Sequence, residues 1–349
     1  MKLLYIGFSQ PNSSIDGVYI KGLTQNGVDV RAHFSPVDSW GRYREVIKIF
    51  REHKGRVDAL IVGYATPQAA IMLRLLTRKP IIYNALCSEY ERKIISRGLA
   101  RRVSLKAMYY WCLDFFACAC ANFVMLETQH QIDFFHSFFR PPRSKFFLAW
   151  TGVDDEKFKL ITGMGKYDEF TVLFRGRFLP EAGADVAVKA AKLLEESGVK
   201  FIILGNGMEL PSVQKVIDEL QPRNLVLRTA FLPDDELFEA MQRSHLSLGQ
   251  LADHDRLKRT IPHKAYESLS LGLPYLTARN PAVMELLREG ETCLACNPGD
   301  AEDLAKKILW AKDHPQELAR IADNGHAFYQ QQLTPRILAG KLLEHLEAL

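Results

Sequence analysis

The stretch TIPHKAYESLSLGLP, residues 260–274, carries both a start and a stop signal for a helix. Pro262 suits the first turn of a helix, where its missing N–H costs no hydrogen bond. Gly272 suits the C-terminal end, where the chain turns with a positive φ. We therefore predict a helix from about His263 to Leu271, placed between strands in the flanking runs LSLGQL and LPYLTA.

The same strand–helix alternation runs through the whole chain. The first half has apolar runs typical of strands in LLYIGF, VDVRAHF, ALIVGY, PIIYNAL, FVMLET and FFLAWTG. The second half has them in TVLFRGR, KFIILGNG, LVLRTAFL, LSLGQL, LPYLTAR and TCLACNPGD, with helical patterns such as ADVAVKAAKLLEESG between them. This alternation predicts two parallel α/β sheets with helices on both faces.

The length of 349 residues also favours two domains over one core. The segment 152–170 has the Gly, Lys and Asp content of a linker. We expect Rossmann-like domains over 1–152 and 153–330, facing each other across a cleft, and a helix over 331–349 that packs back toward the first domain. In such sheets ligands bind at the carboxyl ends of the strands.

Composition narrows the class of protein. The chain is 47% hydrophobic and 25% charged, as in globular proteins, and its net charge of +4 is too small to indicate a nucleic-acid partner. The N-terminus MKLLYIGFSQ is too short and too soon polar for a signal peptide, so we expect a cytoplasmic protein. We therefore expect free thiols at all six cysteines: Cys87, Cys112, Cys118, Cys120, Cys293 and Cys296.

The segment 107–126 is as long as a membrane span and largely apolar. It contains Asp114 and Asn122, and its second half has the pattern of a separate strand. We predict a buried helix followed by a buried parallel strand.

Lys264 and Glu267 stand out within the apolar helix of residues 263–271, because buried charges need partners. A helix N-terminus suits a phosphate, and Lys264 in the first turn would add a full charge. Glu267, when ionised, only accepts hydrogen bonds and suits the vicinal hydroxyls of a ribose. The spacing equally fits an exposed ion pair, which is worth only tenths of a kcal/mol.

Two βα loops of the second half are rich in glycine. Arg177 follows Gly176 at the end of TVLFRGR, where a guanidinium could bind a pyrophosphate in a fork geometry. A surface arginine in a βα loop is the alternative. Gly205 and Gly207 could let the backbone approach a base or a phosphate, although a lone Gly-x-Gly is a weak signal.

Residues 170–310 resemble the nucleotide-binding domain of the retaining glycosyltransferases of family 4, which have the GT-B fold. The resemblance rests on FRGRFLPEAG, FIILGNG, FLPDDEL, IPHKAYESLSLGLP and EGETCLACNPGDAEDLAKKI. The first half resembles the family through LTQNGVDV, ALIVGY and LAWTGVDDEKF. The resemblance implies transfer of a sugar from a nucleotide-diphosphate sugar with retention at the anomeric carbon.

Three features depart from the family pattern. Ala182 replaces a lysine that the family has five residues after its arginine, and Arg259 replaces a glutamate eight residues before Glu267. A histidine often found near the reacting sugar is not evident around NALCSEYE. A branch of the family with an IPxKxxE signature shares the first two departures.

The expected site follows from the resemblance and the chemistry together. Fixed cations would stabilise the charge that develops on the leaving diphosphate, without a metal or another cofactor. The expected catalytic residues are Arg177, Lys264 and Arg259. The expected nucleotide-sugar-binding residues are Gly176, Gly205, Gly207, Pro262 and Glu267. Although DHD at 253–255 resembles a metal-binding motif, it lies in the wrong type of domain, and we expect no metal site.

The acceptor side is less specific. Ser88, Glu89 and Tyr90 follow a predicted strand end and could bind acceptor hydroxyls. Basic and aromatic residues interleave over 97–106 and 136–147, which suits an anionic membrane surface or a solvated face over buried aromatic rings. We expect a glycan or lipid-linked acceptor and a protein that is peripheral on the inner face of the cytoplasmic membrane.

The preferred function is a glycosyltransferase of cell-surface polysaccharide or glycolipid biosynthesis. A sugar-nucleotide epimerase of the same fold would need paired acid–base groups, for which Glu89, Glu91 and His263 are the candidates. A degenerate glycosyltransferase that serves as a scaffold is the non-enzymatic alternative, and Ala182 and Arg259 support it.

Overall fold

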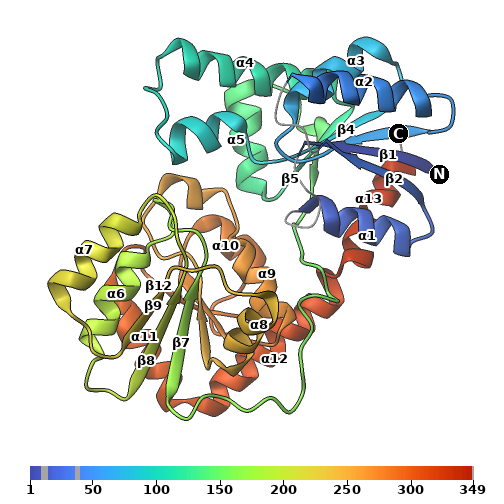
Figure 1. The fold of residues 1–349 in the computed structure, drawn as a ribbon. Coiled ribbons are helices and arrows are strands. Elements are labelled where there is room, and N and C mark those ends of the chain that lie inside the picture. The colour runs from blue at the N-terminus through green and yellow to red at the C-terminus, as the bar shows by residue number, and fades with distance from the viewer. Residues whose placement is uncertain (9–14, 36–39, 348–349) are drawn as a thin grey trace. The chain divides into compact units, whose positions relative to one another are not determined.

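The computed structural model of the protein describes residues 1–8, 15–35 and 40–347, and these form two compact units (Figure 1). Unit 1 comprises Met1–Asp154 and Gln332–Leu349, and unit 2 comprises Asp155–Gln331. The boundaries after Asp154 and Gln331 differ from the expected domain ends at 152 and 330 by two residues and one residue.

Unit 1 contains a parallel sheet of six strands within its described residues, in the order β2-β1-β3-β4-β5-β6. All six runs predicted as strands in the first half form strands. Their bounds are β1 Lys2–Gly7, β2 Asp29–Phe34, β3 Ala59–Val62, β4 Ile81–Leu86, β5 Phe123–Leu126 and β6 Phe146–Leu148. The helical segments are α1 Ile15–Gln25, α2 Gly41–His53, α3 Pro67–Leu76, the π-helix η2 Glu91–Ser96, α4 Leu105–Cys120, α5 Gln129–Phe139 and the short 3-10 helix η3 Arg143–Lys145.

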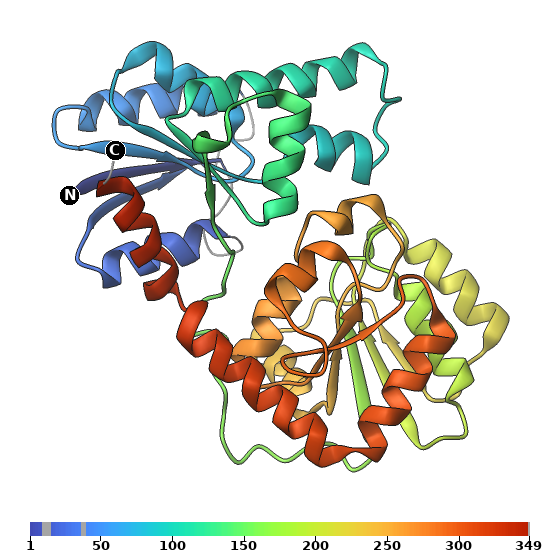
Figure 2. The same cartoon turned by 180° about the vertical axis from the view of Figure 1, so that it is seen from behind.

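The end of the chain returns to unit 1. Helix α13, Pro335–Glu347, packs along α1, and the two lie side by side in Figures 1 and 2. Gly22 makes this close approach possible, because a Cβ there would lie 1.9 Å from the carbonyl oxygen of Pro335. The C-terminal helix expected over 331–349 is thus a packed part of unit 1.

The apolar segment 107–126 forms most of α4 followed by β5, as predicted. Within the described residues, the structure has no helix long and apolar enough to cross a membrane. One part of the prediction is wrong, since α4 is not a buried helix. It buries Ala107, Leu113 and Ala117 but leaves Leu105, Met108, Tyr109 and Phe116 more than half exposed.

Unit 2 contains the second parallel sheet, in the order β12-β11-β10-β7-β8-β9. Its strands are β7 Phe170–Arg175, β8 Val199–Leu204, β9 Leu225–Arg228, β10 Leu246–Leu248, β11 Tyr275–Ala278 and β12 Leu294–Cys296. Its helical segments are α6 Ala184–Leu193, α7 Leu210–Leu220, α8 Asp234–Arg243, η4 Asp255–Lys258, α9 His263–Ser270, α10 Pro281–Leu286, α11 Ala301–Asp313 and α12 Pro315–Gln332. This is the doubly wound Rossmann order, in which the strand sequence reverses between β7 and β10.

The alternation of side chains along β7 places two faces of this sheet in different environments. Val172 and Phe174 belong to the main core, on the face covered by α6 and α11. Leu173 packs on the other face with Leu271 and Leu273, which directly follow α9. Arg175 follows Leu173 by two positions and therefore points to the α9 side of the sheet.

Candidate functional site

The candidate site lies where the strand order of unit 2 reverses. Ligands of doubly wound sheets bind outside the carboxyl ends of the strands at this reversal. The β7 chain leaves the sheet at Gly176, and the β10 chain leaves it at Gly249. Gly176 has a φ of +132°, a conformation that residues with a Cβ rarely adopt. Helix α9 follows the β10 loop and supplies the charged side chains.

Lys264 extends from the first turn of α9 toward both loops. Its side chain is 9% exposed, its Nζ donates to the carbonyl oxygen of Gly249 at 3.1 Å, and it lies 3.9 Å from the centre of the Phe174 ring. A Cβ at Gly176 would lie 3.6 Å from Lys264 Cε. Burial, and then the positive charge of Arg175, lowers the pKa of Lys264 well below its ordinary value. The free site therefore holds this amine at an energetic cost that an anion would relieve.

Glu267 lies one turn further along α9 and has two partners. One carboxylate oxygen, Oε2, forms an ion pair with the guanidinium of Arg175. The other, Oε1, lies 3.0 Å from His263 Nδ1, which must carry a proton because an ionised carboxylate only accepts hydrogen bonds. Lys264 and Glu267 are therefore both buried and do not form the exposed ion pair that the spacing also allowed.

Sequence reasoning missed Arg175. Burial lowers its pKa to about 10, which still leaves the guanidinium protonated at neutral pH. The signal was present in the sequence, because an arginine at the end of an apolar strand needs an anionic partner if the strand is buried. The identity of that partner depends on which helix covers the strand, and the sequence alone does not supply this.

A cavity of about 480 Å³ opens beside these residues. Its lining includes Arg175, Gly176, Arg177 and Gly205, together with the β9–α8 segment Thr229–Leu232. Arg177 is exposed, as an arginine that meets a ligand from solvent should be. The predicted residues Gly176, Arg177 and Gly205 are thus brought together around one hollow.

The glycines allow the two loops to touch. A Cβ at Gly205 would lie 2.0 Å from the carbonyl oxygen of Gly176, and a Cβ at Gly207 would lie 2.5 Å from that of Phe178. Phe178 N also donates to the carbonyl oxygen of Asn206 at 3.0 Å. The glycines of the LGNG run therefore have a structural role in fixing the cavity wall, beyond any contact with a ligand.

Helix α9 begins at His263, as predicted, so Pro262 directly precedes the helix instead of lying within its first turn. Pro262 is the N-cap of α9, with φ −64° and ψ 130°. A proline at the N-cap leaves the N–H groups of the first turn without a side-chain cap. The N–H of Ala265 donates to the carbonyl oxygen of Pro262 at 2.9 Å, so an anion at the start of α9 would meet the N–H groups of His263 and Lys264.

Ala182 and Arg259, the two residues that depart from the family pattern, lie in different environments. Ala182 is 2% exposed and packs in the apolar core of unit 2. Arg259 follows η4, and its guanidinium donates to Asp255 at 2.8 Å. This contact lowers the pKa of Asp255, so the pair is charged on both sides at neutral pH. The positive charge of Arg259 is thus partly neutralised within its own turn.

The residues expected to bind acceptor hydroxyls, Ser88, Glu89 and Tyr90, are buried in unit 1. Ser88 is 1% exposed, and its hydroxyl accepts from the backbone N–H of Glu91. Glu89 is 6% exposed and pairs with Arg92. Tyr90 is 7% exposed. Ser88 and Glu89 thus contact residues at the start of η2.

A buried carboxyl group on α4 accepts hydrogen bonds from the backbone of the segment before η2. Asp114 on α4 accepts from the backbone N–H groups of Glu89 at 3.1 Å and Tyr90 at 2.9 Å. Burial raises the pKa of Asp114 well above its ordinary value. Glu91 is buried too and accepts from Gln131 at 2.8 Å. Glu89, Glu91 and His263 therefore all have internal partners, which weakens the case for an epimerase.

The two basic and aromatic segments of unit 1 differ in their surroundings. In 136–147, Phe139 and Phe146 are core residues, and Lys145 Nζ donates to three backbone carbonyls near the C-terminus of α4. In 97–106, Arg101, Arg102 and Lys106 are exposed beside Val103 and Leu105, which are 97% and 81% exposed. Of these two segments, only 97–106 combines exposed apolar and basic side chains, as membrane contact requires.

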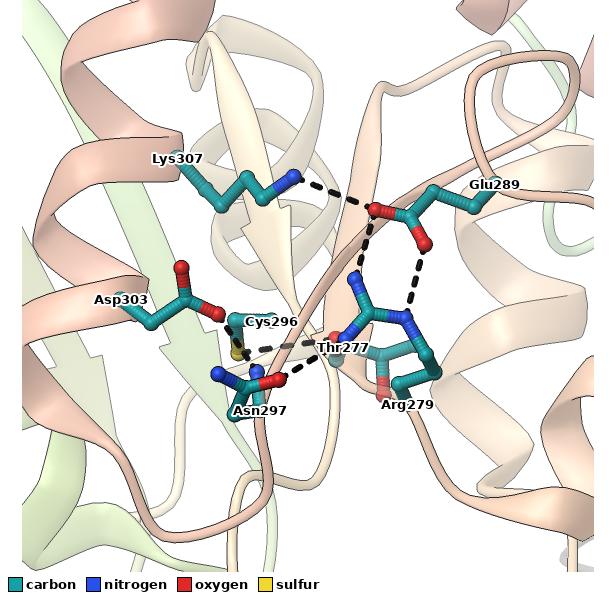
Figure 3. A network of polar contacts seen from close by, with 7 residues as sticks. All are labelled: Thr277, Arg279, Glu289, Cys296, Asn297, Asp303 and Lys307. Carbon is teal, nitrogen blue, oxygen red and sulfur yellow. Dashed lines mark hydrogen bonds and ion pairs between the residues drawn. The ribbon is translucent and has the colours of Figure 1, made fainter.

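The loops after β11 and β12 are joined by a polar network (Figure 3). Arg279 donates to both oxygens of Glu289 at 2.8 Å and to Asn297 at 2.9 Å, and Lys307 lies 3.2 Å from Glu289. The backbone N–H of Asn297 donates to Asp303 at 2.7 Å. The hydrogen bonds from Arg279 are the largest cause that lowers the pKa of Glu289.

This lowered pKa predicts an acid-dependent loss of stability. Glu289 stabilises the fold above its ordinary pKa of about 4.5, and the contribution is lost as the pH falls through its lower folded value. Both side chains are about one-third exposed, so we expect Glu289→Gln to cost only about 0.2–1 kcal/mol at pH 7.

Thermal unfolding of the two proteins between pH 7 and pH 4 checks this. The difference in Tm should shrink toward the acid end, and Glu291→Gln, whose side chain is 60% exposed, serves as the neutral control. A difference that grows on acidification would contradict the assignment.

The match to a family of known proteins lies within unit 2. Residues 161–328 match the family model of glycosyl transferases group 1. The amylovoran biosynthesis glycosyltransferase AmsK of Erwinia amylovora is 22% identical over 60% of this chain, and this chain spans about half (52%) of that relative's length.

Solved structures resemble the whole chain. Anabaena HepE in complex with UDP has a TM-score of 0.75 at 18% identity, with all of both chains covered. The sucrose-phosphate synthase of Thermosynechococcus elongatus has a TM-score of 0.79 at 14% identity, with 100% of this chain and 99% of that chain covered. These likenesses confirm the expected two-domain α/β fold of the GT-B class. Within unit 2, residues 161–328 are thus similar in sequence to the glycosyl transferases group 1.

Proposed function

We propose that the protein transfers a sugar from a nucleotide-diphosphate sugar to a glycan or lipid-linked acceptor, with retention of the anomeric configuration. The reaction would belong to cell-surface polysaccharide or glycolipid biosynthesis, as the name of the AmsK relative suggests. The observation that carries the proposal is the positive charge at the strand reversal of unit 2. Arg175 and Arg177 line one cavity with Gly176, Lys264 lies beside the same glycine, and Glu267 pairs with Arg175.

The proposed chemistry follows from these charges. Breaking the bond between sugar and diphosphate leaves negative charge on the diphosphate and oxocarbenium character on the sugar. Arg177 and Lys264 would stabilise the leaving group, and Glu267 would bind the ribose hydroxyls. We expect Arg259 to contribute less, since it already pairs with Asp255. No cofactor or metal is required by this scheme, in which the nucleotide sugar is a substrate.

A donor screen tests the proposal. The thermal stability of the full chain is measured with UDP-, GDP- and ADP-sugars. A ligand at one hundred times its dissociation constant adds about 2.7 kcal/mol to the free energy of unfolding. We expect one base to stabilise the protein, and UDP is the first choice because HepE was solved with UDP. If no nucleotide raises the Tm, the proposed donor site is wrong.

The two alternatives give different outcomes with the same donors. A scaffold would bind a donor without hydrolysing it, whereas a transferase releases the nucleoside diphosphate slowly even without acceptor. An epimerase would convert the bound sugar nucleotide into its epimer, which chromatography resolves.

We further propose that unit 1 docks on an anionic membrane through the exposed surface of residues 97–109. Val103, Leu105 and Met108 on this surface are more than half exposed, and with Trp111 and Phe138 they line a hollow of about 440 Å³. Arg101, Arg102 and Lys106 lie among them. Apolar side chains that enter the headgroup region and cations that attract anionic lipids act together in peripheral binding.

Vesicle sedimentation checks this prediction. We expect the protein to sediment with vesicles that contain phosphatidylserine, to be released by added salt, and to stay in solution with phosphatidylcholine alone. The double change Val103→Ser and Leu105→Ser should abolish sedimentation. The matched control, Leu75→Ser, removes an 82% exposed leucine elsewhere on unit 1 and should have no effect. Equal binding to neutral and anionic vesicles would reject the proposal.

A further inference from the structure

The carboxylate of Glu267 is held by two donors that come from different parts of unit 2. His263 is on the same helix, one turn earlier, and its Nδ1 lies 3.0 Å from Oε1. Arg175 comes from the end of β7 and pairs with Oε2. The side chain of Glu267 is 9% exposed and that of Arg175 is 14% exposed, so water competes little for this ion pair.

The arrangement leaves a defined part of the carboxylate available. An ionised carboxylate offers about four acceptor positions on its two oxygens. His263 hydrogen-bonds to one oxygen and the Arg175 guanidinium is in ion-pair contact with the other, which leaves about two positions for a ligand. Two vicinal hydroxyl groups need this number of acceptors, and a rotation of the carboxylate would misplace both.

We propose that Arg175 is a positioning residue, which keeps the Glu267 carboxylate oriented to receive the hydroxyl groups of the donor ribose. This inference rests on the proposed function of the site. It gives Arg175 a role in recognition of the ribose, whereas Arg177 and Lys264 bind the diphosphate. The position of Arg175 at the strand reversal makes this possible, since β7 and α9 meet there.

A second role for Arg175 is a direct contact with phosphate. Arg175 lines the 480 Å³ cavity, and its Nε is buried without a hydrogen-bond partner among the described residues. The two roles differ in one measurable property. A residue that contacts the phosphate supports ribonucleotides and 2′-deoxyribonucleotides equally, whereas a residue that positions Glu267 supports the ribonucleotide more, because only the ribonucleotide has both hydroxyls.

The experiment measures dissociation constants of the full chain for UDP and 2′-deoxy-UDP by calorimetry, with GDP and 2′-deoxy-GDP as the second pair. A site that hydrogen-bonds a substrate hydroxyl discriminates against an analogue that lacks it. We expect the wild-type protein to prefer the ribonucleotide roughly tenfold or more, the range of one hydrogen bond to a charged group. Arg175→Met should lose most of this preference, as Glu267→Gln should, because it weakens the ribonucleotide more than the 2′-deoxyribonucleotide, which keeps only one of the two hydroxyls.

Two further variants keep the inference testable. Arg175→Lys retains a positive charge and should recover part of the preference, and it replaces Arg175→Met if that variant does not fold. Arg177→Ala should weaken both nucleotides by the same factor and keep their ratio.

The outcomes are distinct. A ratio in Arg175→Met equal to that of the wild type overturns the inference, whether both affinities are unchanged or both fall together. A wild-type protein that binds UDP and 2′-deoxy-UDP equally overturns it as well. If the wild-type protein binds none of the four nucleotides, the proposed function itself fails.

Discussion

Replacing Arg177 with alanine is expected to lower turnover of the donor about 100-fold, with a smaller effect on donor affinity. Arg177 is exposed at the cavity beside Gly176, so it can follow the diphosphate as negative charge develops on it. Removing one preorganised donor from a transition-state charge costs about 10²–10³ in turnover in other enzymes. An interaction that strengthens as the bond breaks affects kcat more than binding.

The measurement is nucleoside diphosphate release under saturating donor, for wild type, Arg177→Ala and Arg177→Lys. Lysine keeps the charge but not the fork of donors, so we expect partial activity. The matched control is Arg288→Ala, which removes an 80% exposed arginine of the same unit and should retain full turnover. Full turnover by Arg177→Ala would show that Arg177 does not stabilise the leaving diphosphate.

Replacing Lys264 with methionine is expected to have opposite effects on activity and on stability. Turnover should fall about 100-fold, because the amine is next to the Gly176 loop, where the diphosphate would lie. Stability of the free protein should be unchanged or higher, since methionine fills similar space and removes the burial of an amine.

The effect on stability depends on pH in a defined direction. The folded pKa of Lys264 lies well below its unfolded value, so between the two values the unfolded chain binds more protons. The cost of holding the charged amine is fully present below the folded pKa and is lost above about 10.4, the ordinary lysine pKa. The gain in Tm for Lys264→Met should therefore be largest at low pH and shrink as the pH rises.

The control for Lys264 is Lys200→Met on β8, where the lysine side chain is 46% exposed. It should change neither turnover nor the pH dependence of the Tm. A Lys264→Met protein that is active, or one whose Tm falls by many degrees, would show that Lys264 is a structural residue.

The fold could be predicted because its signals are local. Each strand of both sheets is a short apolar run, and each run is separated from the next by a helical pattern or by turn residues. The bounds of α9 followed from a proline and a glycine, and the structure ends this helix at Ser270, one residue before the predicted end at Leu271.

The details of the site depend on contacts between distant parts of the chain. Lys264 and Glu267 could be singled out because charges within a buried helix need partners. Their actual partners are Gly249, Arg175 and His263, and of these only His263 is close in sequence. Arg175 was overlooked because the face of β7 to which it points depends on how α9 packs.

The residues that follow β4 show that a position after a strand end does not fix how exposed a side chain is. Their place after a strand end suggested contact with an acceptor, but Ser88, Glu89 and Tyr90 turn inward. The cause is Asp114, which lies on α4 and binds the backbone of this segment. A pattern of polar residues after a strand does not reveal whether a later helix covers them.

The most direct test of the account is the release of nucleoside diphosphate from a panel of UDP-, GDP- and ADP-sugars by the full chain, without a metal and with a metal chelator present. The account predicts slow release from one class of donor, faster release when glycan or lipid-linked acceptors are added, and about 100-fold less release by Arg177→Ala. Release that is absent from every donor with every acceptor, or that is equal for wild type and Arg177→Ala, would contradict it.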